Sequence, residues 1–494
     1  MLISGLALGA VLGFVMQRGR FCVTGFLRDI FTQRSWRGFV ALLIVISVHA
    51  IGLAALTSAG VITPEYKELA PLAVIIGGVI FGLGIVLAGG CASGTWYRSG
   101  EGLIGSWIAL VFYALSAAAM KTGFLNGLQD SLKDRTVGLT SIHASLGISI
   151  WPLVIALSAV TAYFAVRFLR EEFSGPRPAT LAPRKSGLAH ILTEKTWHVY
   201  ATAAIVGVLG VIAWPLSAAT GRNDGLGITT PSSNLANYVV TGDTERFDWG
   251  VLLVLGILVG SFIAAKASGE FRLRVPDATQ GARSVVGGIF MGVGAAWAGG
   301  CTVGNGMVQT SLFSYQGWLA LASIAAGVAI AAKLWLKPSA PSLNDVPSTP
   351  STTNDTAVSA TAPVTSTATS PVSLPGSEGA GAAGTEASPL AGAFTVAPVA
   401  LLDRSVVKQE DGKLTPLGDG RYELDTVGAV CPFPLIEAKD AINKIEVGEE
   451  LVIPFDCTQA TDAIPRWAAK DGHEVTNFEQ TGEAGWTISV RRGK

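Results

Sequence analysis

Nine long apolar runs fill the first two-thirds of this 494-residue chain, and their length constrains the fold more than any other feature. The apolar core of a bilayer is about 30 Å thick, so a helix needs roughly 17–25 apolar residues to cross it. The runs that we expect to form such helices are residues 2–16, 38–60, 71–89, 103–120, 147–166, 199–217, 249–265, 284–299 and 317–336. Only 14% of the residues are charged, against about one-quarter in soluble domains. The sequence therefore predicts a polytopic α-helical membrane protein with about nine transmembrane helices.

Basic residues are distributed unevenly between the predicted loops. Sixteen Lys and Arg lie in residues 17–37, 90–102, 166–197 and 266–283, whereas the opposite loops hold six. Loops rich in Lys and Arg face the cytoplasm, so nine spans put the N-terminus in the periplasm and the C-terminus in the cytoplasm of a bacterial inner membrane. The first apolar run lacks the basic leader of a cleaved signal peptide, and we expect it to remain in the mature protein.

The net charge of −1 hides a division of the chain into three parts. Residues 1–337 carry 24 Lys and Arg against 15 Asp and Glu, a net charge of +9, whereas residues 401–494 carry 11 against 17, a net charge of −6. Residues 338–398 are rich in Ser, Thr, Pro and Ala and contain no Lys or Arg, a composition typical of a flexible linker. We expect a membrane domain, a linker and a soluble domain at 399–494 whose core spans about 420–492.

The soluble domain shows alternating strand and helix patterns. The predicted elements, in chain order, are a strand at 421–426, a helix at 432–444, a strand at 450–455, a helix at 458–470 and strands near 473–479 and 485–491. This order is βαβαββ and predicts an α+β sandwich.

An internal repeat relates two segments of the membrane domain. Aligned without gaps at an offset of 210, Gly77–Gly94 and Gly287–Gly304 agree at nine of eighteen positions, seven of them glycine. The repeat matches Cys91 with Cys301, and each cysteine directly follows Gly-Gly. A single intramembrane cysteine is commonly an inert small residue, but two at matched positions of a duplicated break favour a function.

Each copy of the repeat also contains a G-x-x-x-G motif, at Gly78/Gly82 and Gly288/Gly292, which lets helix backbones approach closely. An apolar helix that stops at Gly-Gly-Cys indicates an interrupted helix, which membranes tolerate where it lines a cavity. By the loop charges, the first break lies at a cytoplasmic helix end and the second at a periplasmic one. We therefore expect an inverted repeat with re-entrant loops that bring the two thiols together.

A second, weaker repeat adds Cys22 as a third candidate. The pair Gly9/Gly13 is followed by Arg-Gly-Arg-Phe-Cys22, and Gly256/Gly260 is followed by Ser-Gly-Glu-Phe-Arg272. The alignment needs a shift in register, and Arg272 replaces the cysteine, so Cys22 breaks the pseudosymmetry.

Thiols beside helix breaks suit a particular kind of solute. Helix N-termini favour anions, and an S–H group is a weak donor and a soft contact. Together they suit a sulfur-bearing anion better than a hydrated cation or a sugar. The apolar runs lack the carboxylate pairs and histidine chains that mark cation sites, and we expect Arg98, Glu101 and the histidines to be solvated or interfacial.

The soluble domain contains Cys431-Pro-Phe-Pro434 between its first strand and its first helix. A cysteine at a helix N-cap is stabilised as a thiolate, so we expect Cys431 to be an exposed nucleophile; the alternative is a structural cysteine under a Pro-rich turn. Cys457, in Asp456-Cys-Thr-Gln459, also opens a helix, and its role stays open.

These motifs resemble known families. The Gly-Gly-Cys repeats and Arg-Gly-Arg-Phe-Cys22 resemble the YeeE/YedE membrane proteins, bacterial thiosulfate transporters, over residues 1 to about 337. The tail at about 420–492 is similar to TusA/SirA-like sulfur carriers of the YeeD type, so the chain resembles a natural fusion. The resemblance implies an hourglass-like fold in which Cys22, Cys91 and Cys301 line a thiosulfate path, and a carrier whose sulfur-handling residue is Cys431.

Two main hypotheses follow. The first is an inner-membrane importer of thiosulfate whose tethered C-terminal domain docks at the cytoplasmic face and receives or processes the sulfur. The second is a membrane-anchored sulfurtransferase in which Cys431 carries sulfur as a persulfide, so the sequence leaves open whether the chain is an enzyme. A scaffold or redox sensor is a weaker third reading. We expect thiosulfate and the lipid bilayer as partners, and no cofactor, metal or nucleic acid.

Overall fold

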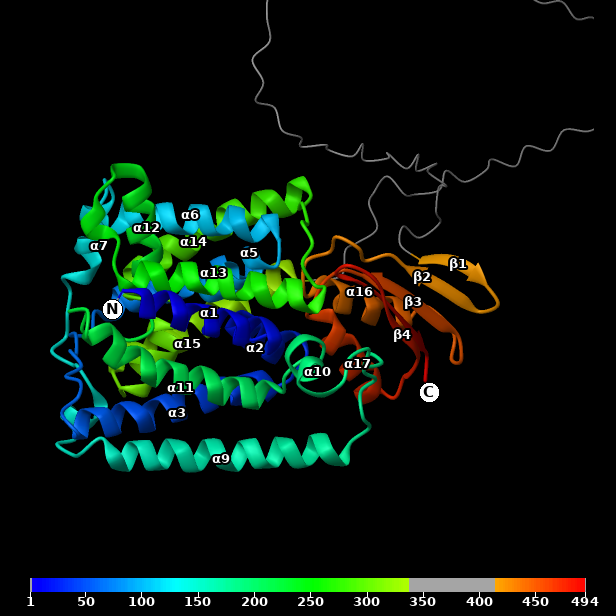
Figure 1. The fold of residues 1–494 in the computed structure, drawn as a ribbon, viewed down its shortest axis with the longest axis horizontal. Helices are drawn as coiled ribbons and strands as arrows, with labels where there is room; N and C mark the ends of the chain where they lie inside the picture. Colours follow the sequence, from blue (N-terminus) through cyan, green and yellow to red (C-terminus); the bar gives the residue numbers. More distant parts are fainter. Residues whose placement is uncertain (1, 337–413, 494) are drawn as a thin grey trace, which may run out of the picture. The chain divides into compact units, whose positions relative to one another are not determined.

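The computed structural model describes residues 2–336 and 414–493, which form a helical region and a small α+β domain (Figure 1). The predicted linker at 338–398 lies outside the described residues.

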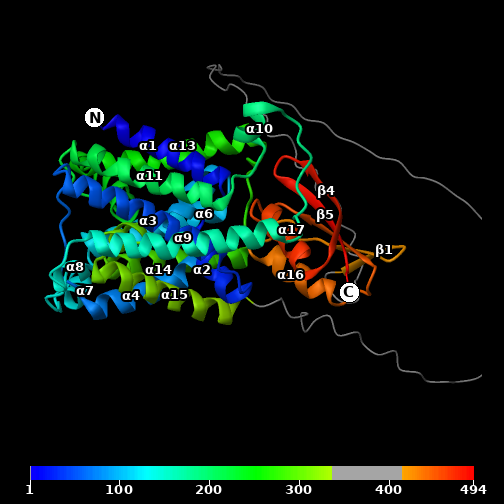
Figure 2. The same ribbon diagram turned by 90° about the horizontal axis from the view of Figure 1, so that it is seen from below.

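The helical region contains helices of very different lengths. In chain order these are α1 (Ile3–Arg18), α2 (Val23–Thr32), α3 (Arg37–Ser58), α4 (Pro71–Leu87), α5 (Ala92–Gly100), α6 (Ile104–Lys121), α7 (Asn126–Lys133), α8 (Ile142–Ser145), α9 (Trp151–Ser174), α10 (Gly187–Thr193), α11 (Val199–Ala218), α12 (Thr229–Thr241), the 3₁₀ turn η1 (Thr244–Arg246), α13 (Trp249–Ser268), α14 (Ala278–Ala298), the π-helical segment η2 (Gly304–Gln309) and α15 (Tyr315–Trp335). The long helices α1, α3, α9, α11 and α13 run side by side in both views (Figures 1 and 2).

Eight helical stretches of the described residues are long and apolar enough to cross a membrane, and they establish a multi-pass membrane protein. In this reckoning α1 and α2 form one stretch, as do α4 and α5. The sequence predicts about nine spans, and the difference is the span at 284–299. This segment lies in α14, a helix of 21 residues whose glycine-rich composition makes it less apolar than the other eight.

The repeated glycines bring helices from the two halves into backbone contact. A Cβ on Gly82 would collide with the backbone of α15, and a Cβ on Gly292 with the backbone of α6. Both G-x-x-x-G motifs therefore act as the sequence predicts. Helix α4 packs on α15, α14 packs on α6, and α4 and α14 pack on each other. Helix α6 follows α4 in the first repeat, and α15 follows α14 in the second. Each of the helices α4 and α14 therefore packs on the last helix of the other repeat.

The two repeated helices run in opposite directions. Gly77, near the start of α4, lies against Ala298 at the end of α14, and Gly84 lies against Gly287. An antiparallel pair is what an inverted repeat requires. The second, weaker repeat also brings two helices into backbone contact, because α1 packs on α13 through Gly9 and Gly256.

The α+β domain is a five-stranded sheet with two helices on one face (Figure 2). Its elements are β1 (Leu414–Gly418), β2 (Arg421–Leu424), α16 (Phe433–Ile442), β3 (Glu450–Phe455), α17 (Ala460–Asp471), β4 (Glu474–Gly482) and β5 (Gly485–Arg491). The strand order is β1-β2-β3-β5-β4, with β2 and β3 parallel and the other neighbours antiparallel. Apolar side chains of the sheet and both helices form one core, in which Phe455 stacks on Trp486.

The strand β1 adds a hairpin that the sequence analysis missed, so the order is ββαβαββ. Asp419 and Gly420 both have positive φ, at 51° and 68°, and an Asp-Gly pair of this conformation makes a tight hairpin turn. The remaining elements confirm the predicted βαβαββ core.

Candidate functional site

The three cysteines of the helical region are free, buried thiols, and each precedes a helical segment. Cys22 is the N-cap of α2 and Cys91 is the N-cap of α5. Cys301 begins the turn that leads into η2. In all three cases the carbonyl oxygen of the cysteine accepts a hydrogen bond of 2.8 to 3.0 Å from the N–H four residues later. The thiols therefore share one local setting, the start of a helical turn inside the protein.

The first glycine of each Gly-Gly-Cys motif ends the preceding helix. Gly89 has φ 72° and Gly299 has φ 78°, in the left-handed region where side chains are strained and where glycine commonly stops a helix. The two breaks of the repeat therefore have the same backbone solution. This explains why the motif requires glycine at this position before each thiol.

A polar side chain from the following segment satisfies the carbonyls that each break exposes. An Nη1 group of Arg98 donates a hydrogen bond to the carbonyl oxygen of Gly89. In the second repeat, Asn305 Nδ2 donates to the carbonyl oxygens of Ala298 and Gly300, at 2.8 and 3.0 Å. Unsatisfied carbonyls are costly at membrane depth, so both breaks need an internal donor.

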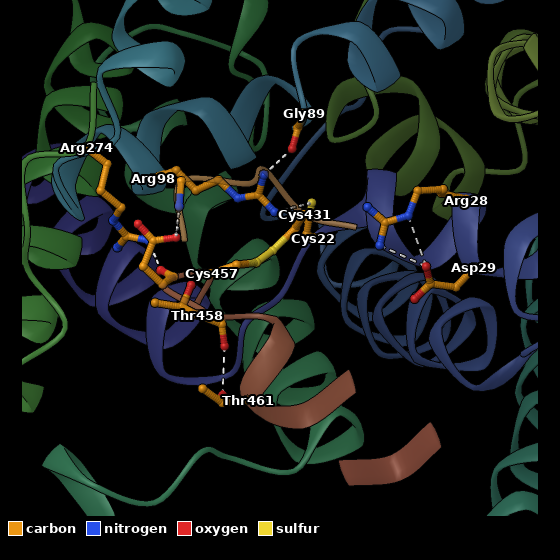
Figure 3. Close-up of a disulfide and its surroundings, with 12 residues drawn as sticks. Cys22, Arg28, Asp29, Gly89, Arg98, Arg274, Cys431, Cys457, Thr458 and Thr461 are labelled. Atoms are coloured by element: carbon orange, nitrogen blue, oxygen red, sulfur yellow. Dashed lines mark hydrogen bonds and ion pairs between the residues drawn. A yellow bond between two sulfur atoms is a disulfide. The ribbon is translucent and has the colours of Figure 1, made fainter. Parts of the chain in front are cut away.

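The expectation that Arg98 and Glu101 are solvated or interfacial is wrong. Their exposed fractions are 5% and 1%. Arg98 is buried because its guanidinium donates a hydrogen bond to the carbonyl oxygen of Gly89 at the helix break. Its Nη2 also lies 3.9 Å from the Cys22 sulfur (Figure 3). His49 is likewise 1% exposed and lies 3.3 Å from Ser311 Oγ.

The structure brings Cys22 and Cys91 together. A Cβ placed on Gly94 would lie 3.3 Å from the Cys91 sulfur and 3.6 Å from the Cys22 sulfur. Cys91 also lies 3.5 Å from Ser93 Oγ. The neighbouring thiol of Cys91 is thus Cys22, whereas Cys301, its partner by the repeat, follows the antiparallel helix α14.

Two threonines beside these thiols escaped the sequence analysis. The hydroxyls of Thr24 and Thr302 are buried and have no hydrogen-bond partner among residues 2–336 and 414–493. Thr302 directly follows Cys301 and Thr24 lies two residues after Cys22, and this closeness in sequence is the signal that could have identified them. A buried hydroxyl without a partner is costly, so both are suited to hydrogen-bond an anion.

A buried ionic cluster joins the two segments of the second, weaker repeat. Arg20 Nη2 lies 2.7 Å from Glu270 Oε1, and Gln17 Nε2 donates to Glu270 Oε2 at 2.6 Å. Arg18 Nη1 lies 3.5 Å from the same carboxylate. Burial acts to raise the pKa of Glu270, but the charges of Arg20 and Arg18 outweigh it and hold that pKa below its ordinary value.

In the α+β domain, Cys431 forms a disulfide with Cys457 (Figure 3). The two Cα atoms are 6.2 Å apart. Pro432 is the N-cap of α16, so Cys431 lies one position earlier than the sequence analysis predicts. The predicted helix boundary is early because proline favours the first turn of a helix without fixing its start. Cys457 likewise lies shortly before α17, whose N-cap is Gln459.

In the comparisons with known proteins, the helical region and the α+β domain match two different families. Residues 18–330 match the sulphur transport family, and residues 422–492 match the family "Sulfurtransferase TusA". The "Thiosulfate transporter TsuA" of Escherichia coli is 52% identical over 328 residues, which are 66% of this chain and 93% of that protein. The protein of the same name from Spirochaeta thermophila is 32% identical over 337 residues, which are 65% of this chain and 94% of that protein.

The tail has relatives of its own. The "Putative sulfur carrier protein TsuB" of Escherichia coli is 59% identical over 70 residues, which are 14% of this chain and 93% of that protein. The chain therefore belongs to the sulphur transport (YeeE/YedE) family and carries, fused at its C-terminal end, a domain of the TusA family.

Proposed function

We propose that this protein imports thiosulfate across the bacterial inner membrane and delivers it to its own C-terminal domain, where Cys431 takes up the sulfur. The observation that carries the proposal is the set of three buried thiols at helix starts, Cys22, Cys91 and Cys301. The names of the two TsuA relatives, both called thiosulfate transporters, support the substrate.

The setting of the thiols fits a dianion that ends in sulfur. Helix starts present N–H groups and a positive dipole end to an anion, and Arg98 adds a fixed positive charge beside Cys22. The cysteine side chains and the hydroxyls of Thr24 and Thr302 would contact the anion weakly. Weak contacts at successive sites let an ion leave as well as enter.

The orientation rests on charge. The loops that we assign to the cytoplasm hold sixteen of the Lys and Arg residues against six on the other side. This assignment, with α14 counted as a ninth span, puts the N-terminus in the periplasm and the C-terminal domain in the cytoplasm.

We further propose that the domain docks at the cytoplasmic face of the helices. Support comes from ion pairs and hydrogen bonds between the two. Arg466 Nη1 lies 2.7 Å from Glu172 Oε1, and Arg37 Nη1 lies 3.9 Å from Asp462 Oδ2. Arg274 donates a hydrogen bond to the carbonyl oxygen of Asp456, next to Cys457. The domain at −6 and the membrane region at +9 also attract each other.

A cavity supports direct delivery to the carrier. Its volume is about 910 Å³, and both Cys22 and Cys431 line it, together with Arg20, Arg28 and Lys439. Eight Lys and Arg residues line the cavity against six Asp and Glu residues, and this excess of positive charge favours an anion. Thiosulfate that leaves Cys22 would therefore reach Cys431 within one cavity.

Uptake of labelled thiosulfate by cells whose only sulfur source is thiosulfate tests the pathway. Cys91→Ala, Cys301→Ala and Cys22→Ala should each lose most of the uptake with normal amounts of protein in the membrane, because alanine fills the space but has no S–H donor. Ser47→Ala is the matched control, since it removes a buried hydroxyl that bonds Thr161 on α9, on helices that carry no pathway thiol. Wild-type uptake by Cys91→Ala and Cys301→Ala would overturn the pathway.

The alternative, a membrane-anchored sulfurtransferase, differs in one result. If the helices mainly anchor the chemistry, Cys431→Ala abolishes the initial rate of uptake. In our proposal Cys431→Ala impairs sulfur use more than initial uptake, because the thiols of the helical region pass the anion along without it.

A further inference from the structure

The second cysteine of the α+β domain has no role in the proposal so far. Cys457 is 5% exposed, whereas Cys431 is partly exposed and lines the cavity that Cys22 also lines. The two cysteines are 26 positions apart in sequence and form a disulfide. An anion that arrives through the cavity therefore meets Cys431 first, and Cys457 lies directly behind it.

The backbone holds the two cysteines together independently of their sulfur atoms. The loop before Cys431 is joined to the end of β3, which precedes Cys457. Thr426 donates two hydrogen bonds to the carbonyl oxygen of Pro454, from its N–H at 3.0 Å and from its hydroxyl at 2.9 Å. Gly428 N–H donates to Asp456 Oδ1 at 3.0 Å. These contacts would keep the thiols adjacent in the reduced protein.

We propose that Cys457 is a resolving thiol, which displaces the sulfur held by Cys431 and releases it as hydrosulfide. The inference rests on the proposed function, because Cys431 must first take the outer sulfur of thiosulfate. It adds a further activity, a reductive cleavage of thiosulfate into sulfite and hydrosulfide within one domain.

The chemistry proceeds in two displacements. The Cys431 thiolate attacks the outer sulfur of thiosulfate, a new S–S bond forms, the S–S bond of thiosulfate breaks, and sulfite leaves. Cys457 then attacks the Cys431 sulfur, and the persulfide sulfur leaves as hydrosulfide. In sum, one thiosulfate and two thiols give one sulfite, one hydrosulfide and one disulfide. The two thiols supply both electrons, and a cellular dithiol must reduce the disulfide before the next cycle.

The surroundings favour both steps. Cys431 and Cys457 lie just before α16 and α17, helices of 10 and 12 residues whose N-terminal ends favour thiolates. Both cysteines also line a second cavity of about 230 Å³, to which Arg98, Arg272 and Arg274 contribute. These three arginines outnumber the two carboxylates in its lining, Glu101 and Asp456, and guanidinium groups suit the anions that arrive and leave.

The test uses the full chain in detergent, reduced and then freed of reductant, with thiosulfate labelled in its outer sulfur. Wild type should release about one sulfite and about one hydrosulfide per chain and then stop, and an added dithiol should restart it. Trypsin cleaves after Arg421, Lys439, Lys444 and Arg466, so residues 422–439 and 445–466 each carry one cysteine. These two peptides should be disulfide-linked after one turnover, a measurement that needs no variant.

Two variants separate the steps. In Cys457→Ser, and in Cys457→Ala as a check on packing, sulfite release should persist while hydrosulfide falls at least about tenfold, and peptide 422–439 should gain one sulfur atom. Cys431→Ala should release neither product. Hydrosulfide at the wild-type amount from Cys457→Ser, or unlinked peptides from wild type after turnover, would overturn the resolving role. Sulfite at the wild-type amount from Cys431→Ala would instead overturn the proposed function itself.

Discussion

Replacement of Arg98 by glutamine should slow thiosulfate uptake by one to two orders of magnitude. Arg98 donates to the carbonyl oxygen of Gly89 at the helix break and lies 3.9 Å from the Cys22 sulfur. A buried hydrogen bond from a charged group is worth about 1.5–3 kcal/mol. If uptake loses that stabilisation, the rate falls about 10- to 150-fold, at 1.4 kcal/mol for each factor of ten.

The assay is the initial rate of labelled thiosulfate uptake over a range of concentrations, normalised to the amount of protein in the membrane. Arg98→Lys should fall between wild type and Arg98→Gln, because lysine keeps the charge but cannot reach two acceptors with a planar fork. Arg167→Gln is the control, since it removes an arginine whose exposed side chain pairs with Glu171. Wild-type rates for Arg98→Gln in correctly folded protein would refute the role of this side chain.

Three further predictions concern other parts of the chain. Gly89→Ala or Gly299→Ala should each lower stability in detergent by about 1–2 kcal/mol, since both have positive φ, whereas Gly304→Ala, which meets open space, should not; equal thermal unfolding of all three would contradict this. Glu270 has a lowered pKa when folded, so its charge stabilises the protein above about pH 4.5 and this contribution is lost as the pH falls through the folded-state pKa. Glu270→Gln should cost about 3–5 kcal/mol at neutral pH and flatten the acid side of the unfolding profile, and an unchanged profile would argue against the cluster. A cut within 338–398 should slow growth on limiting thiosulfate, and overexpression of the separate domain should restore it; unimpaired growth after the cut would show that the tether is dispensable.

Patterns that repeat along the chain predicted more of the structure than any other feature of the sequence. Glycines at a fixed offset of 210 predict two equivalent helix breaks, and the positive φ of Gly89 and Gly299 provides their common cause. The periods of strand and helix in the tail predict most of its elements, because each buries one face against the same core. The order of residues along the chain was sufficient for both.

Features that depend on distant contacts could not be predicted in this way. Arg98 resembles a loop residue in the sequence, and only the break after Gly89 makes it a buried donor. The closeness of the Cys22 and Cys91 thiols depends on how α2 and α5 pack. The repeat instead predicts that Cys91 lies near Cys301. Cys457 carries no motif of its own, and its position behind Cys431 depends on β2 and β3 being neighbours in the sheet.

Flux through the purified chain in proteoliposomes tests the central claim most directly. Vesicles that contain the wild-type protein and an inwardly directed thiosulfate gradient should accumulate label, and vesicles with Cys91→Ala should not. Vesicles with Cys431→Ala should show an initial influx close to that of wild type, because the pathway thiols lie in the helical region. Influx through Cys91→Ala at the wild-type rate, or no influx through the wild-type protein, would contradict the account.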